Sequence, residues 1–264
     1  MTRPAEQRET GEGTEIFLTE IFSAIQGEAA LVGERQVFVR LAGCNIRCGY
    51  CDQPEALERR PGPCRVEQMP GRRDFRTVDS PLATPSAADA VERLWKGLPH
   101  HSVSITGGEP LFQARRLEIL LAELTRRGQR VYLETNGMLV PGLRRVARYV
   151  EYVSIDIKLP SVDGEQVDPG VQRAFLRVAR AECPQVFTKI VISAHTDQVE
   201  LGAALEMIHA EAPDSDVFLQ PVTPFGSVLD APTPSQVLDL QDRALRVHPR
   251  VRVVPQTHKM MGQL

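Results

Sequence analysis

Two patterns of apolar and polar positions alternate along most of the chain, and they predict helices and strands in turn. Helical spacing of apolar residues marks the segments 85–95, 117–124, 141–148, 169–182, 197–211 and 234–247. Short apolar runs typical of buried strands lie between them, at 101–105, 130–134, 152–157, 186–192, 217–220 and 251–254. Strands that alternate with helices in this way indicate an α/β fold with a parallel sheet covered by helices.

The first third of the chain departs from this alternation. An apolar stretch begins near Ile16 and turns at Gly27, and a second apolar run follows at 36–43, so two more strands are predicted. Residues 1–14 are polar and are expected to form a disordered lead, with 15–264 as a single domain. The stretch 54–85 is rich in proline and arginine and has no regular apolar period, so it is predicted to be an irregular insertion.

Polar residues gather directly after the predicted strands. They are Cys44 to Cys51, Thr106 to Glu109, Glu134 to Asn136, Asp156, Lys158 and Gln220. The carboxyl ends of parallel strands meet at one edge of a sheet, where the loops converge and sites form. All of these groups should therefore lie around one opening at that edge of the sheet.

Cys44, Cys48 and Cys51 follow a predicted strand with the spacing C-x3-C-x2-C. Three thiolates this close together can bind three irons of a [4Fe–4S] cube and leave the fourth iron without a protein ligand. A structural zinc site would need a fourth ligand, and Cys64 is the nearest candidate. Disulfides do not suit an odd number of 5 cysteines. Cys64 and Cys183 have no partner motif and are expected to be ordinary loop and core residues. A non-catalytic zinc-binding module remains the alternative.

Two further polar signals lie near the start of the chain. Arg40 is the one charge in the apolar run 36–43, and an unpaired guanidinium is costly to bury. It therefore needs a carboxylate, from either a protein acid or an acidic substrate. Gln26 and Glu28 flank the Gly27 turn, where an amide and a carboxylate together can read the edge of a heterocycle.

Charge and composition narrow the function classes. The 31 basic and 34 acidic residues are mixed along the sequence, and the net charge of -3 gives no electrostatic footprint for nucleic acid. No segment approaches the ~20 apolar residues of a membrane span, and the start lacks the apolar core of a signal peptide. We expect small-molecule substrates and a cytoplasmic location.

The cysteine loop closely resembles that of the radical S-adenosylmethionine (SAM) enzymes, with Tyr50 where that superfamily keeps an aromatic residue. The resemblance implies a partial (β/α)6 barrel and a [4Fe–4S] cluster whose open iron is chelated by the amino and carboxyl groups of SAM. Lys158 would pair with the SAM carboxylate, whereas a lysine at a strand end is otherwise a solvated charge. The cofactor-binding residues implied by the resemblance are Tyr50, Gly107, Gly108, Glu109, Asn136, Asp156, Lys158 and Gln220.

Three stretches are similar to one branch of that superfamily, the 7-carboxy-7-deazaguanine synthases. They are Ile25-Gln26-Gly27-Glu28, Phe38-Val39-Arg40-Leu41 and the tail 255–264. That resemblance implies conversion of 6-carboxy-5,6,7,8-tetrahydropterin to 7-carboxy-7-deazaguanine with loss of ammonia, in queuosine and 7-deazapurine biosynthesis. It implies catalytic roles for Glu134 and His258. The substrate-binding residues that it implies are Ile25, Gln26, Gly27, Glu28, Arg40, Thr106, His258 and the terminal carboxylate of Leu264.

One position departs from the branch. The family places Thr or Ser after Cys-Asp as a Mg²⁺ ligand, whereas this chain has Gln53. An amide oxygen can serve a hard cation, but Mg²⁺ demands strict geometry, so the sequence leaves magnesium open. The resemblance further implies a homodimer and a flavodoxin or ferredoxin-type electron donor. The other reading within the superfamily is an activase that installs a glycyl radical on a partner protein.

Overall fold

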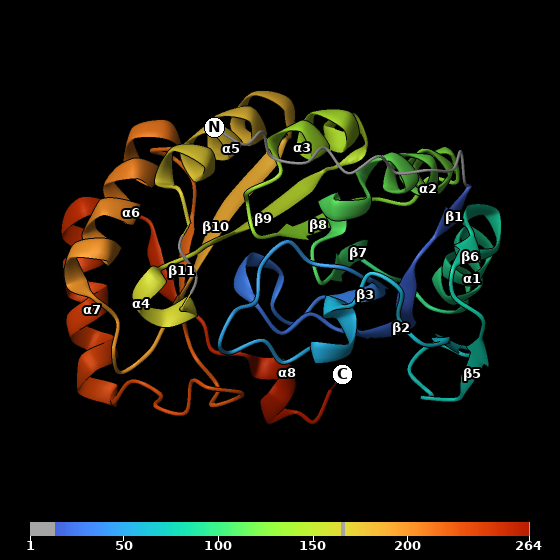
Figure 1. Cartoon of the computed structure of the whole chain (residues 1–264), viewed down its shortest axis with the longest axis horizontal. Helices are drawn as coiled ribbons and strands as arrows, with labels where there is room; N and C mark the ends of the chain where they lie inside the picture. Colours follow the sequence, from blue (N-terminus) through green and yellow to red (C-terminus); the bar gives the residue numbers. More distant parts are fainter. Residues whose placement is uncertain (1–13, 165–166, 264) are drawn as a thin grey trace, which may run out of the picture.

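A curved sheet of ten strands runs through the computed structural model, which describes residues 14–164 and 167–263. Its parallel part contains, in spatial order, β3 (Arg35–Leu41), β7 (Ser102–Gly107), β8 (Val131–Thr135), β9 (Tyr152–Ile157), β10 (Gln185–Ile192), β11 (Val217–Pro221) and β12 (Val251–Val253). Figure 1 shows helices along the outer side of this sheet, while the loop that follows β3 crosses its inner side. The α/β fold predicted from the sequence, with a parallel sheet covered by helices, is confirmed, and the sheet is parallel over its larger part.

The helices that alternate with these strands cover the outer face. They are α1 (Thr84–Gly97), α2 (Ala114–Arg126), α3 (Val140–Val146), α5 (Pro169–Glu182), α6 (Gln198–Glu211) and α7 (Pro234–Val247). Side-chain caps fix several of their starts: Asp197 accepts hydrogen bonds from two backbone N–H groups of α6, and Thr233 forms a capping box with Gln236 in α7. None of the described helices is long and apolar enough to cross a membrane.

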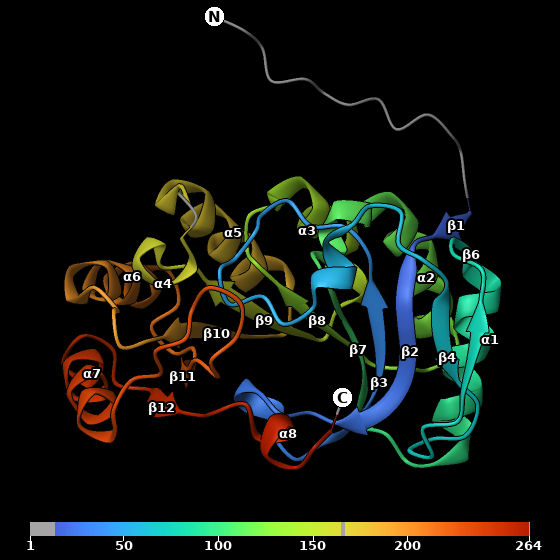
Figure 2. The ribbon, with the colours of Figure 1, turned by 60° about the horizontal axis from the view of Figure 1, so that its bottom comes forward.

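The other edge of the sheet is mixed. Here β2 (Leu18–Ile25) pairs antiparallel with β3, β4 (Cys64–Glu67) pairs parallel with β2, and β5 (Phe75–Val78) pairs antiparallel with β4. Figure 2 shows β4 beside β2 at this edge. A separate short pair joins β1 (Glu15–Ile16) to β6 (Leu82–Ala83).

The stretch 54–85 is therefore not an irregular insertion, and that prediction is wrong. It begins with a 3-10 turn, η2 (Pro54–Leu57), and then supplies an edge hairpin of the main sheet. The pattern hid these strands because they are short and because Arg65 and Arg76, at exposed positions, interrupt the apolar run. Charges of this kind protect an edge strand from pairing with another chain. Cys64 is correspondingly a buried strand residue rather than a loop residue.

The lead predicted for residues 1–14 lies outside the described residues, apart from Thr14. The carbonyl oxygen of Thr14 accepts a hydrogen bond from the Thr84 backbone N–H at 2.8 Å, at the start of α1.

The two faces of the sheet carry different side chains, because successive residues of a strand point to opposite sides. The outward positions are aliphatic and fully buried beneath the helices, as at Leu133, Val153 and Ile190. The inward positions near the amino ends of four strands form an aromatic layer with η1 (Ala29–Leu31), made of Tyr132, Tyr152, Phe187 and Phe218. The next inward position on each of these strands is polar, and these residues are Glu134, Ser154, Lys189 and Gln220.

The turn that follows β7 lies directly against the start of the cysteine loop. Gly107 has φ +135°, and a Cβ there would stand 2.1 Å from the carbonyl oxygen of Leu41. A Cβ on Gly108 would stand 2.4 Å from the carbonyl oxygen of Gly43. The Gly108 N–H donates to the Leu41 carbonyl at 3.0 Å, which binds the two backbones together. Both glycines are therefore required by the close approach of two chain segments.

We predict that Gly107→Ala destabilises the protein by roughly 3 kcal/mol or more, because overpacking costs ~1–3 kcal/mol and a left-handed non-glycine residue ~1–2 kcal/mol. Gly33→Ala is the matched control, since Gly33 has φ +92° but nothing within 4 Å of its added Cβ. Urea unfolding of both variants measures the difference. Equal losses of unfolding free energy would contradict the close-approach explanation.

Candidate functional site

A cavity of about 210 Å³ lies at the carboxyl ends of the parallel strands. All described site residues predicted from the sequence line it, with Glu109 as the exception. Those on its wall are Ile25, Gln26, Gly27, Glu28, Arg40, Cys44, Cys48, Tyr50, Cys51, Gln53, Thr106, Gly107, Gly108, Glu134, Asn136, Asp156, Lys158, Gln220 and His258. A second cavity of about 610 Å³ adjoins the first and shares with it Arg40, Asp52, Gln53, Thr223 and His258.

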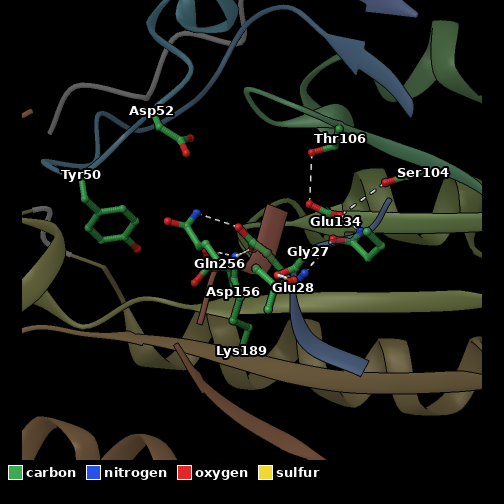
Figure 3. Close-up of polar contacts among 12 residues, drawn as sticks. Gly27, Glu28, Tyr50, Asp52, Ser104, Thr106, Glu134, Asp156, Lys189 and Gln256 are labelled. Carbon is green, nitrogen blue, oxygen red and sulfur yellow. Dashed lines mark hydrogen bonds and ion pairs between the residues drawn. The ribbon is translucent and has the colours of Figure 1, made fainter. Parts of the chain in front are cut away.

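Lys189 projects from β10 into the first cavity and pairs with Glu28 (Figure 3). Its Nζ lies 2.6 Å from Glu28 Oε2 and 3.5 Å from Asp156 Oδ2. Burial alone would raise the pKa of Glu28, but the attraction of Lys189 and a hydrogen bond from Gln256 outweigh it and lower that pKa to about 2. Sequence analysis missed Lys189, although a lone charge inside the apolar run 186–192 is the same signal that marked Arg40.

Lys158 is 7% exposed, so it is not a solvated charge. Its Nζ lies 3.0 Å from Asp156 Oδ2 and 3.4 Å from Asp163 Oδ1, and it donates a hydrogen bond to the Tyr50 hydroxyl at 2.8 Å. Burial opposes the charge of Lys158, but these acidic neighbours prevail and raise its pKa. A contact between Lys158 and the carboxylate of SAM stays a prediction.

The Gln26 side chain is 3% exposed and is committed to protein groups. Its Nε2 donates to Gln36 Oε1 at 2.9 Å and to Glu134 Oε1 at 2.8 Å, and its Oε1 accepts from the Glu28 N–H at 3.0 Å. Gln36 in turn donates to Ser102 Oγ at 2.8 Å, which fixes the direction of both amides. This arrangement argues against the predicted reading of a heterocycle edge by Gln26. The amide instead holds Glu134 and the turn around Gly27.

Glu134, at the end of β8, accepts hydrogen bonds from hydroxyl groups of the neighbouring strand (Figure 3). Ser104 Oγ donates at 3.3 Å and Thr106 Oγ1 at 3.2 Å. Burial, together with the negative charge of Glu28, raises the pKa of Glu134. The cavity thus contains two carboxyl groups whose pKa values are shifted in opposite directions, which is the arrangement of acid and base pairs in enzyme sites.

Glu109 is fully buried and turned away from the cavity. Its carboxylate accepts hydrogen bonds from Leu111 N at 3.0 Å, Thr135 Oγ1 at 2.9 Å and Asn136 N at 2.7 Å. Burial raises the pKa of Glu109 to about 7. The carboxylate fixes the turn after β8, and a role of Glu109 in SAM binding stays a prediction. Asn136, held in this way, donates its amide to Asn45 Oδ1 in the cysteine loop at 2.8 Å.

The C-terminal segment packs on the Gly27 turn, where α8 (Thr257–Met260) lies beside the blue N-terminal segment in Figure 2. The Thr257 N–H donates to the Gly27 carbonyl at 3.0 Å, and Gln256 Nε2 donates to Glu28 Oε1 at 2.8 Å. A Cβ on Gly27 would stand 2.3 Å from His258 Nδ1, so only glycine admits the histidine. Burial lowers the pKa of His258, which favours the neutral imidazole. The predicted contact of Leu264 lies outside the described residues.

Arg40 lines both cavities and is 9% exposed. Its Nε lies 3.2 Å from Glu20 Oε2, and the other oxygen of Glu20 lies 3.1 Å from Arg65 Nη1. The sequence left open whether a protein acid or an acidic substrate neutralises Arg40, and Glu20 supplies a protein acid. Substrate binding by the rest of the guanidinium stays a prediction.

Comparison with known proteins decides the family. Residues 39–195 match the Radical SAM superfamily. The 7-carboxy-7-deazaguanine synthase of Geobacter sulfurreducens is 43% identical over 251 residues, covering 94% of this chain and 97% of that protein. The chain belongs to the 7-carboxy-7-deazaguanine synthase family of radical SAM proteins.

Other relatives agree with this assignment. The 7-carboxy-7-deazaguanine synthase of Methanopyrus kandleri is 35% identical over 92% of each chain. The crystal structure of QueE from Escherichia coli has 18% sequence identity and a TM-score of 0.59, over 92% of this chain and 94% of that one. This second likeness shows that the fold is shared.

Membership of the radical SAM superfamily implies a [4Fe–4S] cluster and SAM, and the residues present fit both groups. Cys44, Cys48 and Cys51 line one cavity, as ligands of a single cluster must. Burial raises the pKa of Cys48 to about 12 despite the attraction of Lys158, but a coordinated thiol is deprotonated by its metal.

Two buried oxygen atoms of residues on the cavity wall also point to a ligand in this radical SAM protein. Asp156 Oδ1 and Gln220 Oε1 have no hydrogen-bond partner among the described residues. Buried acceptors of this kind are rarely left unpaired. The amino group and hydroxyl groups of SAM are donors that could satisfy them.

The described residues do not form a protein site for a single metal ion. Within residues 14–164 and 167–263, no group of three or more His, Cys, Asp or Glu side chains could hold a metal ion. An iron–sulfur cube places each thiolate on a different iron, so its ligands need not converge on one point. Gln53, at the position of the family's Mg²⁺ ligand, lines both cavities beside Asp52, which lies 2.6 Å from Lys259 Nζ.

The Glu28–Lys189 pair generates a pH-dependent prediction. The folded pKa of Glu28 is about 2, below its ordinary 4.5, so the stability that its charge provides is present above pH about 4.5 and is lost as the pH falls toward about 2. Lys189→Met should lower the free energy of unfolding by roughly 3 kcal/mol at neutral pH, the usual cost of breaking a buried pair. The difference in free energy of unfolding between Lys189→Met and the unmodified protein should become smaller as the pH falls below about 4.5.

Urea unfolding between neutral and acidic pH measures this difference. Lys96→Met is the control, because the Lys96 side chain is 72% exposed in its pair with Glu92 and such surface pairs contribute ~0–1 kcal/mol. If the loss of unfolding free energy in Lys189→Met did not change with pH, Glu28 would be ruled out as the origin of that loss.

Proposed function

We propose that this protein is a radical SAM lyase that converts 6-carboxy-5,6,7,8-tetrahydropterin to 7-carboxy-7-deazaguanine with release of ammonia. One observation carries the proposal. The three cysteines, the Gly107–Gly108 turn and the Gly27 turn all line one cavity, in a chain that is 43% identical to a named 7-carboxy-7-deazaguanine synthase over 94% of its length.

Cys44, Cys48 and Cys51 would hold the cluster, and Asn136, Asp156 and Gln220 would surround SAM. When bound, the cluster and SAM supply an electron and a 5′-deoxyadenosyl radical that takes a hydrogen atom from the substrate. Glu28, Arg40 and His258 line the same cavity and are left to contact the pterin.

Each residue on the substrate wall has a distinct task in this proposal. Glu28, kept ionised by Lys189, is an acceptor for the N–H groups of the pterin ring. Arg40 has Nη donors besides the Nε that faces Glu20, and a guanidinium fork matches a carboxylate such as that of the substrate. Burial and the charge of Glu28 raise the pKa of Glu134, which makes this carboxyl group the better suited of the two to exchange a proton with the substrate.

The partners follow from the same proposal. The substrate is a small molecule, and a one-electron reductant must reach the cluster from outside. A flavodoxin or ferredoxin-type donor and a homodimer are inferred from the family resemblance, whereas the cytoplasmic location is inferred from the sequence pattern. The comparisons do not favour an activase of a glycyl radical enzyme or a zinc-binding module, because relatives that cover 94% and 92% of this chain are named 7-carboxy-7-deazaguanine synthases.

An anaerobic assay with SAM, a reductant and the carboxypterin tests the proposal, with 7-carboxy-7-deazaguanine as the measured product. We predict that Cys48→Ala loses the brown colour, the bound iron and all product formation. Cys64→Ala is the matched control and should keep all three, because Cys64 is buried in β4 and does not line the cavity. Absence of product from the unmodified, cluster-loaded protein would refute the proposed function.

A second prediction concerns the substrate carboxylate. Arg40→Lys should raise the KM for the carboxypterin more than tenfold, equivalent to ~1.4 kcal/mol, because an ammonium cannot reproduce the bidentate fork. Arg65→Lys should leave KM within about twofold, since Arg65 shares Glu20 with Arg40 but does not line the first cavity. Similar KM values for both variants would assign Arg40 a purely structural role.

A further inference from the structure

The hairpin of β4 and β5 is tied to the body of the sheet by Glu67, which is 1% exposed. Glu67 Oε2 accepts a hydrogen bond from the Ser23 N–H in β2 at 2.8 Å. Its other oxygen accepts from the Arg73 N–H in the hairpin turn, also at 2.8 Å. A single buried carboxylate thus fixes the position of the turn.

Arg73 is held by this contact in a conformation that arginine rarely adopts. Its φ is +57°, in the left-handed region that costs a non-glycine residue ~1–2 kcal/mol. Strain of this kind persists where surrounding contacts determine it, and it gathers at functional sites. From this turn the guanidinium of Arg73 reaches across and donates a hydrogen bond to the carbonyl oxygen of Gly262.

Within the described residues 257–263, the segment that Arg73 reaches has no buried apolar side chain. No residue of α8 is buried, and the side chains of Met260 and Met261 are 79% and 48% exposed. A helix of one turn is unstable in isolation. Polar contacts must therefore hold the segment in place.

Those contacts form a short series along the segment. Thr257 is bound to Gly27 at its start, and Lys259 Nζ lies 2.6 Å from Asp52 in the middle. Beyond this point the Gln263 N–H donates to the His258 carbonyl at 2.8 Å, which closes the last turn on itself. Arg73 then joins that turn to the rest of the protein.

We propose that the β4–β5 hairpin is a clasp for the C-terminal segment, and that Arg73 is a positioning residue for substrate binding. By holding the carbonyl of Gly262, Arg73 keeps Gln256 and His258 on the cavity wall. The effect on substrate affinity rests on the proposed function, whereas the clasp itself does not. The β4–β5 hairpin thus has a role in the site although it lies at the sheet edge.

Hydrogen exchange of the full-length protein tests the clasp without reference to activity. In Arg73→Ala the protection factors of the backbone amides of residues 261–263 should fall at least tenfold, while those of the parallel strands stay unchanged. Arg76→Ala is the matched control, because Arg76 is an exposed arginine of the same hairpin. Arg73→Lys, which keeps a donor, should restore part of the protection. Equal protection of 261–263 in the Arg73→Ala and Arg76→Ala variants would overturn the clasp.

Kinetics of the cluster-loaded protein test the link to the substrate. Arg73→Ala should raise the KM for the carboxypterin about tenfold and leave kcat and substrate-independent SAM cleavage within about twofold, whereas Arg76→Ala should change none of them. A loosened segment with an unchanged KM would overturn the positioning role. If the unmodified protein makes no 7-carboxy-7-deazaguanine, the proposed function fails, and the exchange measurement still decides the clasp.

Discussion

The ion pair between Glu28 and Lys189 is the contact on which the geometry of the site depends. Glu28 follows β2, which belongs to the mixed part of the sheet, whereas Lys189 lies in β10. In the sheet, β7, β8 and β9 lie between β3, the neighbour of β2, and β10. Backbone pairing does not close the sheet, since β5 and β12 are its two edges among the described strands. Buried pairs need additional hydrogen bonds to offset desolvation, and Gln256 donates one to Glu28. Side chains thus join two parts of the sheet across its concave face.

The distribution of side chains on the inner face explains why the cavity lies where it does. Aromatic residues and η1 fill the interior near the amino ends of the strands, so the space that remains is at the carboxyl ends. Two residues beyond the aromatic layer, the inward side chain of each of these strands is polar. Charged groups in this polar layer are partly shielded from water. Lys158 and Lys189 offset the acids in this layer, which keeps the wall ordered before any ligand binds.

The fold and most of the cavity wall could be predicted from the sequence, because both follow from local patterns. Apolar periods marked the strands and helices, and polar residues after strands marked the site. Directions of side chains could not be predicted, since they depend on distant partners: Gln36 and Ser102 fix the amide of Gln26, and backbone groups capture Glu109. The hairpin after Pro63 was missed because its strands gain their stability from pairing with β2 rather than from their own composition.

The opposite pKa shifts of Glu28 and Glu134 are linked through Lys189, although burial is the largest cause of the rise at Glu134. Lys189 lowers the pKa of both carboxyl groups, but it contacts Glu28 directly and acts on Glu134 only through space. The charge that Lys189 maintains on Glu28 in turn raises the pKa of Glu134. Removal of the lysine would therefore favour protonation of Glu28 and weaken its effect on Glu134. One cation thus keeps the two carboxyl groups distinct, which a cavity with two equivalent acids could not achieve.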